Sequence, residues 1–260
     1  MRVAQTTAES ILDVVVARAH TVTIRGRKVH PYFIASDLAA LAALIVALTV
    51  LGQFPGIAGT QFALVFVGMF VYYRGALAMK ARWLAMPSRS FLQDTLFILL
   101  PMYGLVVWTL HYPRALAFDV VGVLLPAYIA VVRIGCFLGG CCYGVPSRYG
   151  VLYPREIFTP VDGCRRFRPG PVPNGRVLPV QLVESAGAAL LFVFLFAWLT
   201  RQPTPPGTAL PLFLLGYCSF RVVLDFWRTS SARPHIGRWT EAQILCVLTS
   251  SFCVIWLAVH

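Results

Sequence analysis

Long apolar segments recur along this 260-residue chain and limit its possible folds more than any other feature. A helix of about 20 apolar residues crosses a hydrocarbon core about 30 Å thick, and several segments approach that length. None of them shows the alternation of a transmembrane β-strand. Because lipid offers backbone amides no hydrogen-bond partner, the spanning segments are predicted to be helices. Only 12% of the residues are charged, against roughly 25% in soluble domains, which indicates an integral membrane protein.

The apolar segments predict an all-α membrane protein with about seven transmembrane helices in one domain, residues 1–260. The predicted spans are 36–53, 61–73, 92–110, 115–140, 179–199, 208–227 and 241–260. Residues 1–34 are expected to form a polar arm outside the bilayer, whose β-branched stretches suit a small hairpin. Residues 145–178 contain six prolines and six arginines, so a long extramembrane excursion is predicted there.

Positively charged residues gather in four of the predicted extramembrane segments. The arm, the loop around Lys80, the 145–178 excursion and the loop 228–238 hold 18 of the 22 Lys and Arg residues. Seven spans place all four segments on one side of the membrane. The positive-inside bias would make that side cytoplasmic. A cationic rim that attracts anionic lipid headgroups is the alternative interpretation.

Arg133 and Arg221 lie inside predicted spans, where a charged side chain is costly. An arginine at the centre of a spanning helix costs roughly 2.5 to 3.5 kcal/mol, so such a residue usually faces a cavity or a partner. Snorkelling to the interface is the alternative. The sequence FRVVLDFWR places Arg221, Asp225 and Arg228 at i, i+4 and i+7, on one helix face. Two cations flank one anion there, and the surplus predicts a site for an anionic ligand such as phosphate.

Gln181 and Glu184 form a second polar pair, at i and i+3 near the start of a predicted span. They belong either to the site or to a helix start whose dipole an acid complements. The run RIGCFLGGCCYG carries four glycines, Gly135, Gly139, Gly140 and Gly144. Glycines allow close approach of a second helix or of a ligand, and both interpretations stay open. Together with Arg133, they predict a helix end at headgroup level that suits a phosphate.

These residues fall in sequence blocks that resemble a known family. The blocks are RIGCFLGGCCYG at 133–144, YGVLYP at 149–154, LPVQLVES at 178–185, GYCSFRVVLDFWR at 216–228 and WTEAQIL at 239–245. In order and spacing they resemble the bacterial prolipoprotein diacylglyceryl transferases, and VHPYF at 29–33 is similar to that family's tyrosine motif.

The resemblance implies a seven-helix enzyme of the bacterial cytoplasmic (inner) membrane. Such an enzyme moves the diacylglyceryl group of phosphatidylglycerol to the thiol of the lipobox cysteine in the signal peptide of a preprolipoprotein, and glycerol phosphate leaves. The expected partners are these two substrates and the lipid bilayer; no cofactor, metal or nucleic acid is expected. The resemblance places the basic face outside the cytoplasm, opposite to the charge count.

The resemblance also implies roles for individual residues. Arg133 and Arg221 correspond to two essential arginines of the family and are the candidate catalytic residues. The candidate substrate-binding residues are Tyr32, Gly144, Gln181, Glu184, Asp225 and Arg228. The sequence departs from the family at Cys136, where Asn is usual, at Cys141, where Glu is usual, and at Leu92 and Gln93, where a histidine is expected. Any step that the histidine performs, such as helping to deprotonate the acceptor thiol, needs another group here or the peptide's own ionisation.

Cys136, Cys141 and Cys142 admit four interpretations. They are small apolar residues in a packed helix end, or they form a disulfide in which Cys164 could take part. A thiolate stabilised by Arg133 is the third interpretation. A metal site is the fourth and the least favoured, because no histidine is close in sequence and adjacent cysteines do not match zinc-site spacing.

The mechanism predicted from these residues uses fixed guanidinium groups. Arg133, Arg221 and Arg228 would hold the lipid phosphodiester and stabilise the charge on the departing oxygen. Asp225 would hold Arg221 and Arg228 in register, and Tyr32 would cap the headgroup from the arm or serve as an interfacial anchor. The five histidines, His20, His30, His111, His235 and His260, are expected at the surface.

Other functions fit the same residues. A paralogue could use an anionic phospholipid donor with a different acceptor, as the altered cysteine-rich signature suggests. A non-catalytic protein that binds or transports anionic lipids would also need buried arginines and glycines, although a transporter would be expected to show repeated halves. A scaffold with a redox-active cysteine cluster is the last alternative.

Overall fold

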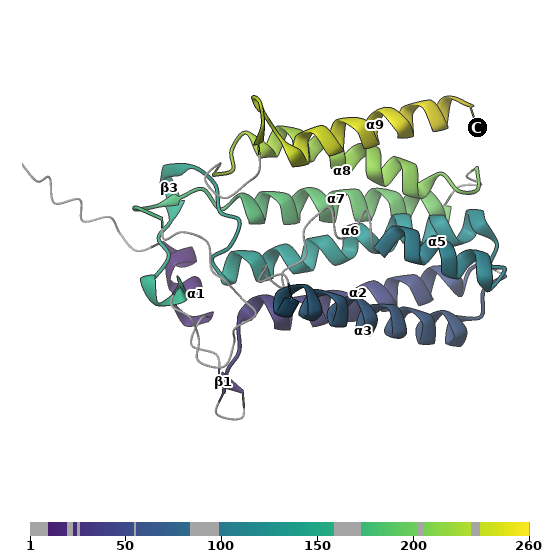
Figure 1. Cartoon of the computed structure of the whole chain (residues 1–260), viewed down its shortest axis with the longest axis horizontal. Coiled ribbons are helices and arrows are strands. Elements are labelled where there is room, and N and C mark those ends of the chain that lie inside the picture. Colours follow the sequence, from purple (N-terminus) through teal and green to yellow (C-terminus); the bar gives the residue numbers. More distant parts are fainter. Residues whose placement is uncertain are drawn as a thin grey trace, which may run out of the picture.

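The computed structural model describes residues 10–19, 23–24, 27–54, 56–83, 99–158, 173–201, 205–229 and 235–259. Long helices lie side by side in a bundle, and α1 and β3 lie at one end of it (Figure 1). The helices are α1 (Ile11–Ala19), α2 (Pro31–Leu51), α3 (Gly59–Trp83), α5 (Leu100–Thr109), α6 (Arg114–Leu138), α7 (Val180–Arg201), α8 (Ala209–Asp225) and α9 (Glu241–Val259). Short elements complete the description: β1 (Thr23–Ile24), β2 (Arg27–Lys28), β3 (Pro146–Val151), the 3-10 helix η2 (Arg155–Phe158), β4 (His235–Ile236) and β5 (Trp239–Thr240).

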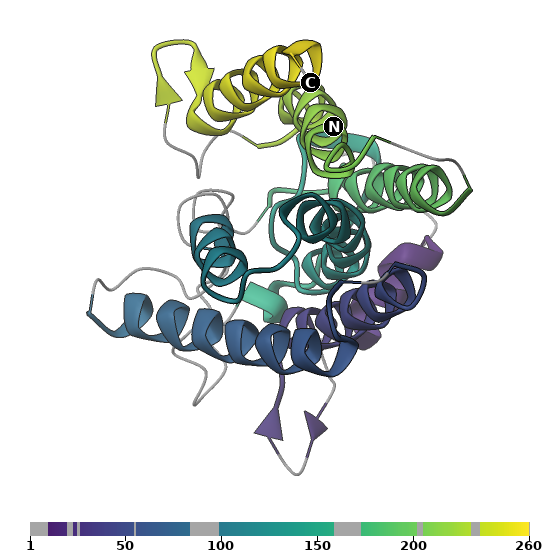
Figure 2. The same ribbon diagram turned by 90° about the vertical axis from the view of Figure 1, so that its right-hand side faces the viewer.

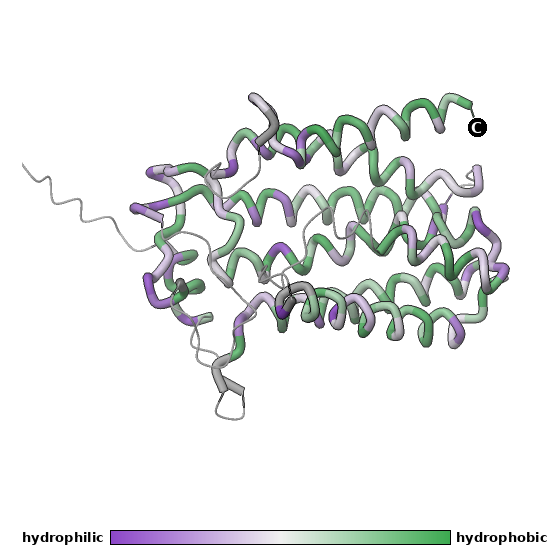
Figure 3. The backbone as a smooth tube through the Cα atoms, in the orientation of Figure 1, coloured by the Kyte–Doolittle hydropathy of each residue, from purple (hydrophilic) through white to green (hydrophobic). Residues whose placement is uncertain are grey.

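The helix lengths agree with a multi-pass membrane protein. In the described part of the chain, five helices, α2, α3, α6, α7 and α9, are long and apolar enough to cross a bilayer. α8 covers most of the predicted sixth span but has 17 residues. α5 covers the second half of the predicted third span, 92–110, whose first residues lie outside the described ranges. Apolar residues follow the helices, and polar residues concentrate at their ends (Figure 3).

α6 is the central helix of the bundle. It packs against α2, α7 and α8, which surround it when the bundle is viewed end on (Figure 2). Within its apolar span 61% of the residues are buried, against 17% for the peripheral helices α3 and α9. Small residues permit this close packing: Ala39, Ala43 and Ala47 are fully buried at four-residue spacing on α2. Gly122 of α6 leaves no room for a side chain, because a Cβ there would lie 2.4 Å from the Ala209 backbone at the start of α8.

Asp119 is a buried carboxylate near the first residues of α6. It accepts hydrogen bonds from the backbone N–H groups of Gly207 and Ala209, at 2.7 and 2.8 Å. The Ala209 N–H is one of the donors that the first turn of α8 cannot satisfy within the helix, and Gly207 lies two residues before that helix. Asp119 therefore fastens the start of α8 to α6.

The predicted arm contains the expected hairpin and an additional helix. β1 and β2 pair antiparallel, which confirms the hairpin. α1 was not predicted; it begins with a reciprocal cap in which Ser10 and Asp13 each accept the other's backbone N–H. Asp13 also accepts from Leu152 N and forms an ion pair of 2.7 Å with Arg176. Burial alone would raise the pKa of Asp13, but these hydrogen bonds lower it on balance.

Two boundaries differ from the prediction in ways that affect charged residues. α2 begins at Pro31, so Tyr32 lies in its first turn and not in an arm. α3 continues to Trp83, so Arg74, which was assigned to a loop, lies within a helix. Its guanidinium is 3.4 Å from Asp37 of α2 and also contacts Ser36. The ion pair satisfies a charge that would otherwise be costly in lipid.

Candidate functional site

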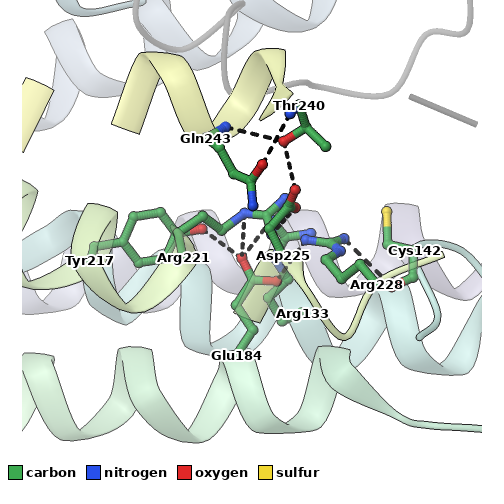
Figure 4. A network of polar contacts seen from close by, with 9 residues as sticks. All are labelled: Arg133, Cys142, Glu184, Tyr217, Arg221, Asp225, Arg228, Thr240 and Gln243. Atoms are coloured by element: carbon green, nitrogen blue, oxygen red, sulfur yellow. Dashed lines mark hydrogen bonds and ion pairs between the residues drawn. The ribbon is translucent and has the colours of Figure 1, made fainter. Parts of the chain in front are cut away.

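The carboxylate of Glu184, on α7, lies at the centre of a polar network inside the bundle (Figure 4). Glu184 is fully buried, and Arg133 Nη2 of α6 lies 2.9 Å from its Oε1. Arg228 Nη1 lies 3.2 Å from Oε2, and Arg221 Nε of α8 lies 3.8 Å from Oε1. The Tyr217 hydroxyl donates to Oε1 at 2.6 Å. Cations from separate parts of the chain therefore converge on one anion.

α8 presents the next layer of the network. Tyr217, Arg221 and Asp225 are spaced by four residues and share one helix face. Arg221 Nη1 is 3.0 Å from Asp225 Oδ1, and the Thr240 hydroxyl donates to Asp225 Oδ2 at 2.6 Å. Thr240 is oriented by Gln243, which donates its backbone N–H to Thr240 Oγ1 and accepts the Thr240 N–H. The start of α9 thus fixes the Asp225 carboxylate, which in turn fixes Arg221.

The charges and hydrogen bonds of the network do not balance internally. Three guanidinium groups face the carboxylates of Glu184 and Asp225, so one positive charge is in excess. Among the described residues, Arg133 Nε, Arg228 Nε and Gln181 Oε1 are buried without a hydrogen-bond partner. A buried unsatisfied polar group costs roughly 1 to 3 kcal/mol. Spare donors beside excess positive charge are what an anionic ligand would use.

Arg228 lies outside the helical stripe that the sequence predicted. α8 ends at Asp225, and the following turn carries Arg228 across to Gly144, with which it forms a backbone bridge. The guanidinium of Arg228 contacts Glu184 on α7. Asp225 was expected to hold Arg221 and Arg228 in register; in the structure its carboxylate pairs with Arg221, and the carboxylate of Glu184 binds Arg228.

The end of the glycine-rich run packs tightly against neighbouring backbone. Gly144 N–H donates to Leu178 O at 2.8 Å, and a Cβ at Gly144 would lie 2.6 Å from Trp227 O. Glycine is required there by close packing, and its contribution to lipid binding stays a prediction. Gln181 Nε2 donates to Cys141 O at 2.7 Å, which ties α7 to the same run.

α6 ends within the cysteine-rich sequence. Its last residue is Leu138, and Gly140 and Cys142 both have positive φ, at 64° and 61°. The resulting turn brings Cys141 N–H to the carbonyl of Cys136 at 3.1 Å. Glycine adopts this conformation easily, whereas a cysteine rarely does, so Cys142 is held in a strained conformation.

All three cysteines of this run are free thiols. Cys136 and Cys141 are buried, whereas Cys142 is partly exposed. Arg133 Nη1 is 3.9 Å from Cys136 Sγ, and Cys141 Sγ donates to Cys136 O at 3.6 Å. Cys164 lies outside the described residues. In the described ranges, no group of three or more His, Cys, Asp or Glu side chains is placed to hold a metal ion.

Tyr32 and His30 lie beside this run. Tyr32 is buried against Val132, Cys136 and Cys141. The expectation that all five histidines lie at the surface is wrong for His30, which is 9% exposed. His30 caps α2 by accepting the Tyr32 N–H, and its ring packs where a side chain at Gly139 would be. Burial lowers the pKa of His30 to about 4, against a weaker opposing effect of its hydrogen bond with the Gly139 backbone.

The structure thus brings together most of the residues that the sequence singled out. Arg133, Glu184 and the charged residues of the 221–228 segment form one network, and Gly144, Gln181 and Tyr32 lie around the adjacent cysteine run. Sequence reasoning missed four residues, Tyr217, Thr240, Gln243 and His30. All four fall in the blocks GYCSFRVVLDFWR, WTEAQIL and VHPYF, so membership in a block was the available signal.

The bundle and its buried cationic centre define a multi-pass α-helical membrane protein with a polar site at one end of its central helix. The chain belongs to the prolipoprotein diacylglyceryl transferase family, because the family model with that description matches residues 95–259, more than half of the chain.

Several similar proteins are phosphatidylglycerol–prolipoprotein diacylglyceryl transferases. The one from Clostridium tetani (strain Massachusetts / E88) is 30% identical over 119 residues, 45% of this chain and 42% of the relative. The one from Acinetobacter baylyi is 27% identical over 164 residues, 60% of this chain and 56% of the relative. The one from Azoarcus sp. (strain BH72) is 33% identical over 137 residues, 50% of this chain and 45% of the relative. The chain spans about half the length of these relatives.

Proposed function

We propose that this protein transfers the diacylglyceryl group of phosphatidylglycerol to the lipobox cysteine thiol of a preprolipoprotein. The observation that carries the proposal is the unbalanced cationic centre, where the Nε donors of Arg133 and Arg228 are buried and unpaired within the described residues. The names of the relatives support the choice of donor and acceptor.

The depth of the centre suits a phospholipid headgroup. Arg133 precedes the end of α6 by five residues, which at 1.5 Å per residue places its Cα about 8 Å inside the helix end. The long arginine side chain can reach from that depth toward the headgroup region. Its side chain is 20% exposed, against 10% for Arg221 and 3% for Arg228, so Arg133 is the most open of the three cations.

The proposed reaction is a displacement at carbon. The acceptor thiolate attacks the glycerol carbon that carries the phosphate, a C–S bond forms and the C–O bond to phosphate breaks. The bonding electrons leave with the phosphate oxygen, and glycerol phosphate is the leaving group. Arg133 and Arg221, held by Glu184 and Asp225, stabilise the charge on that oxygen with little reorganisation.

We further propose seven spans in the bacterial inner membrane, with α5 in the third and α8 as the sixth. This arrangement puts α1, β3 and the connection between α8 and α9 on one side. The family orientation makes that side extracytoplasmic.

The test is to incubate the purified protein with phosphatidylglycerol vesicles and a synthetic lipobox peptide, and to weigh the peptide by mass spectrometry. We expect a diacylglyceryl mass gain that falls at least about a hundredfold in rate in Arg133→Ala and Arg221→Ala, since losing one preorganised donor costs roughly 3 kcal/mol. Arg114→Ala, at the exposed first residue of α6, is the matched control and should retain the wild-type rate. A peptide of unchanged mass with the wild-type protein would refute the proposal.

A paralogue with another acceptor is the second candidate. Free thiols stand at Cys136 and Cys141, where the family usually has Asn and Glu, and they support this alternative. Release of glycerol phosphate from phosphatidylglycerol without any gain in peptide mass would favour it.

A further inference from the structure

We propose that Cys142 acts as a thiolate general base that deprotonates the acceptor thiol. The inference rests on the proposed transfer reaction and adds a residue to it. Its basis is the placement of the three thiols at the end of α6, beside two of the arginines of the centre.

The three thiols are not equivalent. Cys136 and Cys141 are buried, and the Cys141 thiol donates to the Cys136 carbonyl, which keeps its proton engaged within the turn. Cys142 is partly exposed, and its φ of 61° is unusual for a residue with a side chain. Of the three cysteines, Cys142 is therefore the most accessible to a substrate, and its backbone is strained.

Two arginines lie close to Cys142. Arg228 Nη2 is 3.5 Å from the Cys142 carbonyl, and Figure 4 shows the Cys142 side chain beside the Arg228 guanidinium. Among the described residues, the charged and titratable groups that face Cys142 are the thiols of Cys136 and Cys141, the guanidinium groups of Arg228 and Arg133, and the phenol of Tyr153. The neighbouring thiols of Cys136 and Cys141 lower the pKa of Cys142, burial opposes this effect, and the two arginines lower the pKa further.

The other proton acceptors near the centre are already engaged. Glu184 binds three arginines and the Tyr217 hydroxyl, and Asp225 binds Arg221 and Thr240.

His30 is occupied as well. Its Nδ1 accepts the Tyr32 N–H, the ring makes a further hydrogen bond with the Gly139 backbone, and the side chain is buried. Cys142 remains as an accessible group that can take a proton.

The chemical step is a proton transfer between two sulfur atoms. The acceptor thiol, whose unperturbed pKa is about 8.5, is only a few per cent ionised at neutral pH. Cys142 takes its proton and becomes a neutral thiol, and the acceptor becomes the thiolate that attacks the lipid carbon. The same arginines stabilise both thiolates, so the exchange carries little electrostatic cost. Cys142 then gives its proton to the departing phosphate or to water.

The decisive variant is Cys142→Gly, because glycine adopts positive φ without strain and the substitution removes the thiol together with its Cβ. We expect its kcat at pH 7 to fall about a hundredfold, within the range for loss of a general base. The ratio of the wild-type kcat to the variant kcat should fall to about threefold near pH 9.5, because the peptide thiol then ionises by itself. Cys142→Ser should behave in the same way, and Cys253→Ser, a buried thiol of α9, is the control that keeps the wild-type profile.

The possible outcomes separate this inference from the proposed function. A Cys142→Gly protein as active as wild type at pH 7, or one with the same deficit at every pH, overturns the base role and leaves the transferase standing. A diacylglyceryl mass gain on Cys142 itself, with lipid alone, makes it an acceptor and also overturns the base role.

If the wild type modifies no peptide, the proposed function fails and the base role for that acceptor fails with it. Alkylation by iodoacetamide at about pH 6.5, mapped by mass spectrometry, tests the thiolate without any turnover. We expect Cys142 to react at least about tenfold faster than glutathione. An equal or slower rate overturns the inference even in an active protein.

Discussion

Two buried carboxylates, Glu184 and Asp119, face opposite ends of the bundle and have opposite surroundings. Asp119 accepts two backbone N–H groups at the start of α8, and these donors are fixed by the helix. Glu184 is surrounded by side chains: three guanidinium groups and the hydroxyl of Tyr217. Both anions are fully engaged, so burial of a charge does not by itself distinguish a functional site from a structural one.

The difference lies in what surrounds each carboxylate. At Asp119 the hydrogen bonds close within the backbone. At Glu184 the cations outnumber the anions, and the Nε donors of Arg133 and Arg228 are left over within the described residues. Surplus cations with spare donors indicate a ligand, whereas a carboxylate satisfied by backbone indicates a cap. Substitutions at the two carboxylates should therefore separate activity from stability.

Glu184→Gln should have the largest effect. It removes the negative charge on which three arginines converge, and uncompensated buried charge costs roughly 3 to 5 kcal/mol. We expect both a loss of about 4 kcal/mol in the free energy of unfolding and a transferase rate below detection. Denaturant unfolding in detergent and the lipobox-peptide assay measure the two effects. A folded and active Glu184→Gln protein would mean that the arginines do not depend on this anion.

Asp119→Ala should affect stability alone. It leaves the N–H groups of Gly207 and Ala209 unsatisfied, at roughly 1 to 3 kcal/mol each, so we expect about 3 kcal/mol of destabilisation. The kcat of the folded fraction should stay within about twofold of wild type. Asp119 and Arg133 both lie on α6, but they are separated along it by about 21 Å at 1.5 Å per residue, so the two sites should act independently. A large loss of kcat in fully folded protein would contradict the contrast between the two carboxylates.

The location of the spans could be predicted from sequence because long apolar segments are a local signal. The predicted 115–140 and 179–199 segments correspond to α6 and α7 within a few residues. Arg74 was misplaced for the same reason: the charge ended the apolar segment, whereas α3 continues to Trp83 and Arg74 pairs with Asp37 of α2. Such compensation is a tertiary contact and leaves no mark on the local pattern.

The site was predictable where residue type and spacing carried the information. Arg221 and Asp225 pair as the four-residue spacing indicated. Arg228 left the stripe because the helix ends at Asp225, and helix ends are poorly defined by periodicity. Thr240 and His30 are ordinary polar residues near helix starts, and their importance depends on which element packs opposite them.

Because His30 is buried, we expect the folding stability of the protein to depend on pH in a way that does not involve the cationic centre. The pKa of His30 in the folded protein is about 4, against about 6.5 when unfolded, so the unfolded chain binds the proton more readily. The contribution of the neutral His30 to the free energy of unfolding is complete above about pH 6.5 and decreases as the pH falls toward 4. Between pH 7 and 5 we expect a loss of about 2 kcal/mol. Thermal unfolding of His30→Gln at the two pH values should show a smaller difference than wild type, and an equal difference would assign the acid sensitivity to another group.

Thr240→Val is expected to have the smallest effect and tests how far the network around Glu184 extends. The substitution keeps the shape of the side chain but removes the hydroxyl that donates to Asp225 at 2.6 Å. A hydrogen bond to a charged group contributes roughly 1.5 kcal/mol at the low end of its range, which corresponds to about tenfold in rate if the loss falls on the transition state. Asp225 would then hold Arg221 less firmly, so kcat should fall while KM for the lipid changes little. Thr240→Ser retains the hydroxyl and should restore the rate; failure of that rescue would show that Thr240 acts through the packing of α9 and not through Asp225.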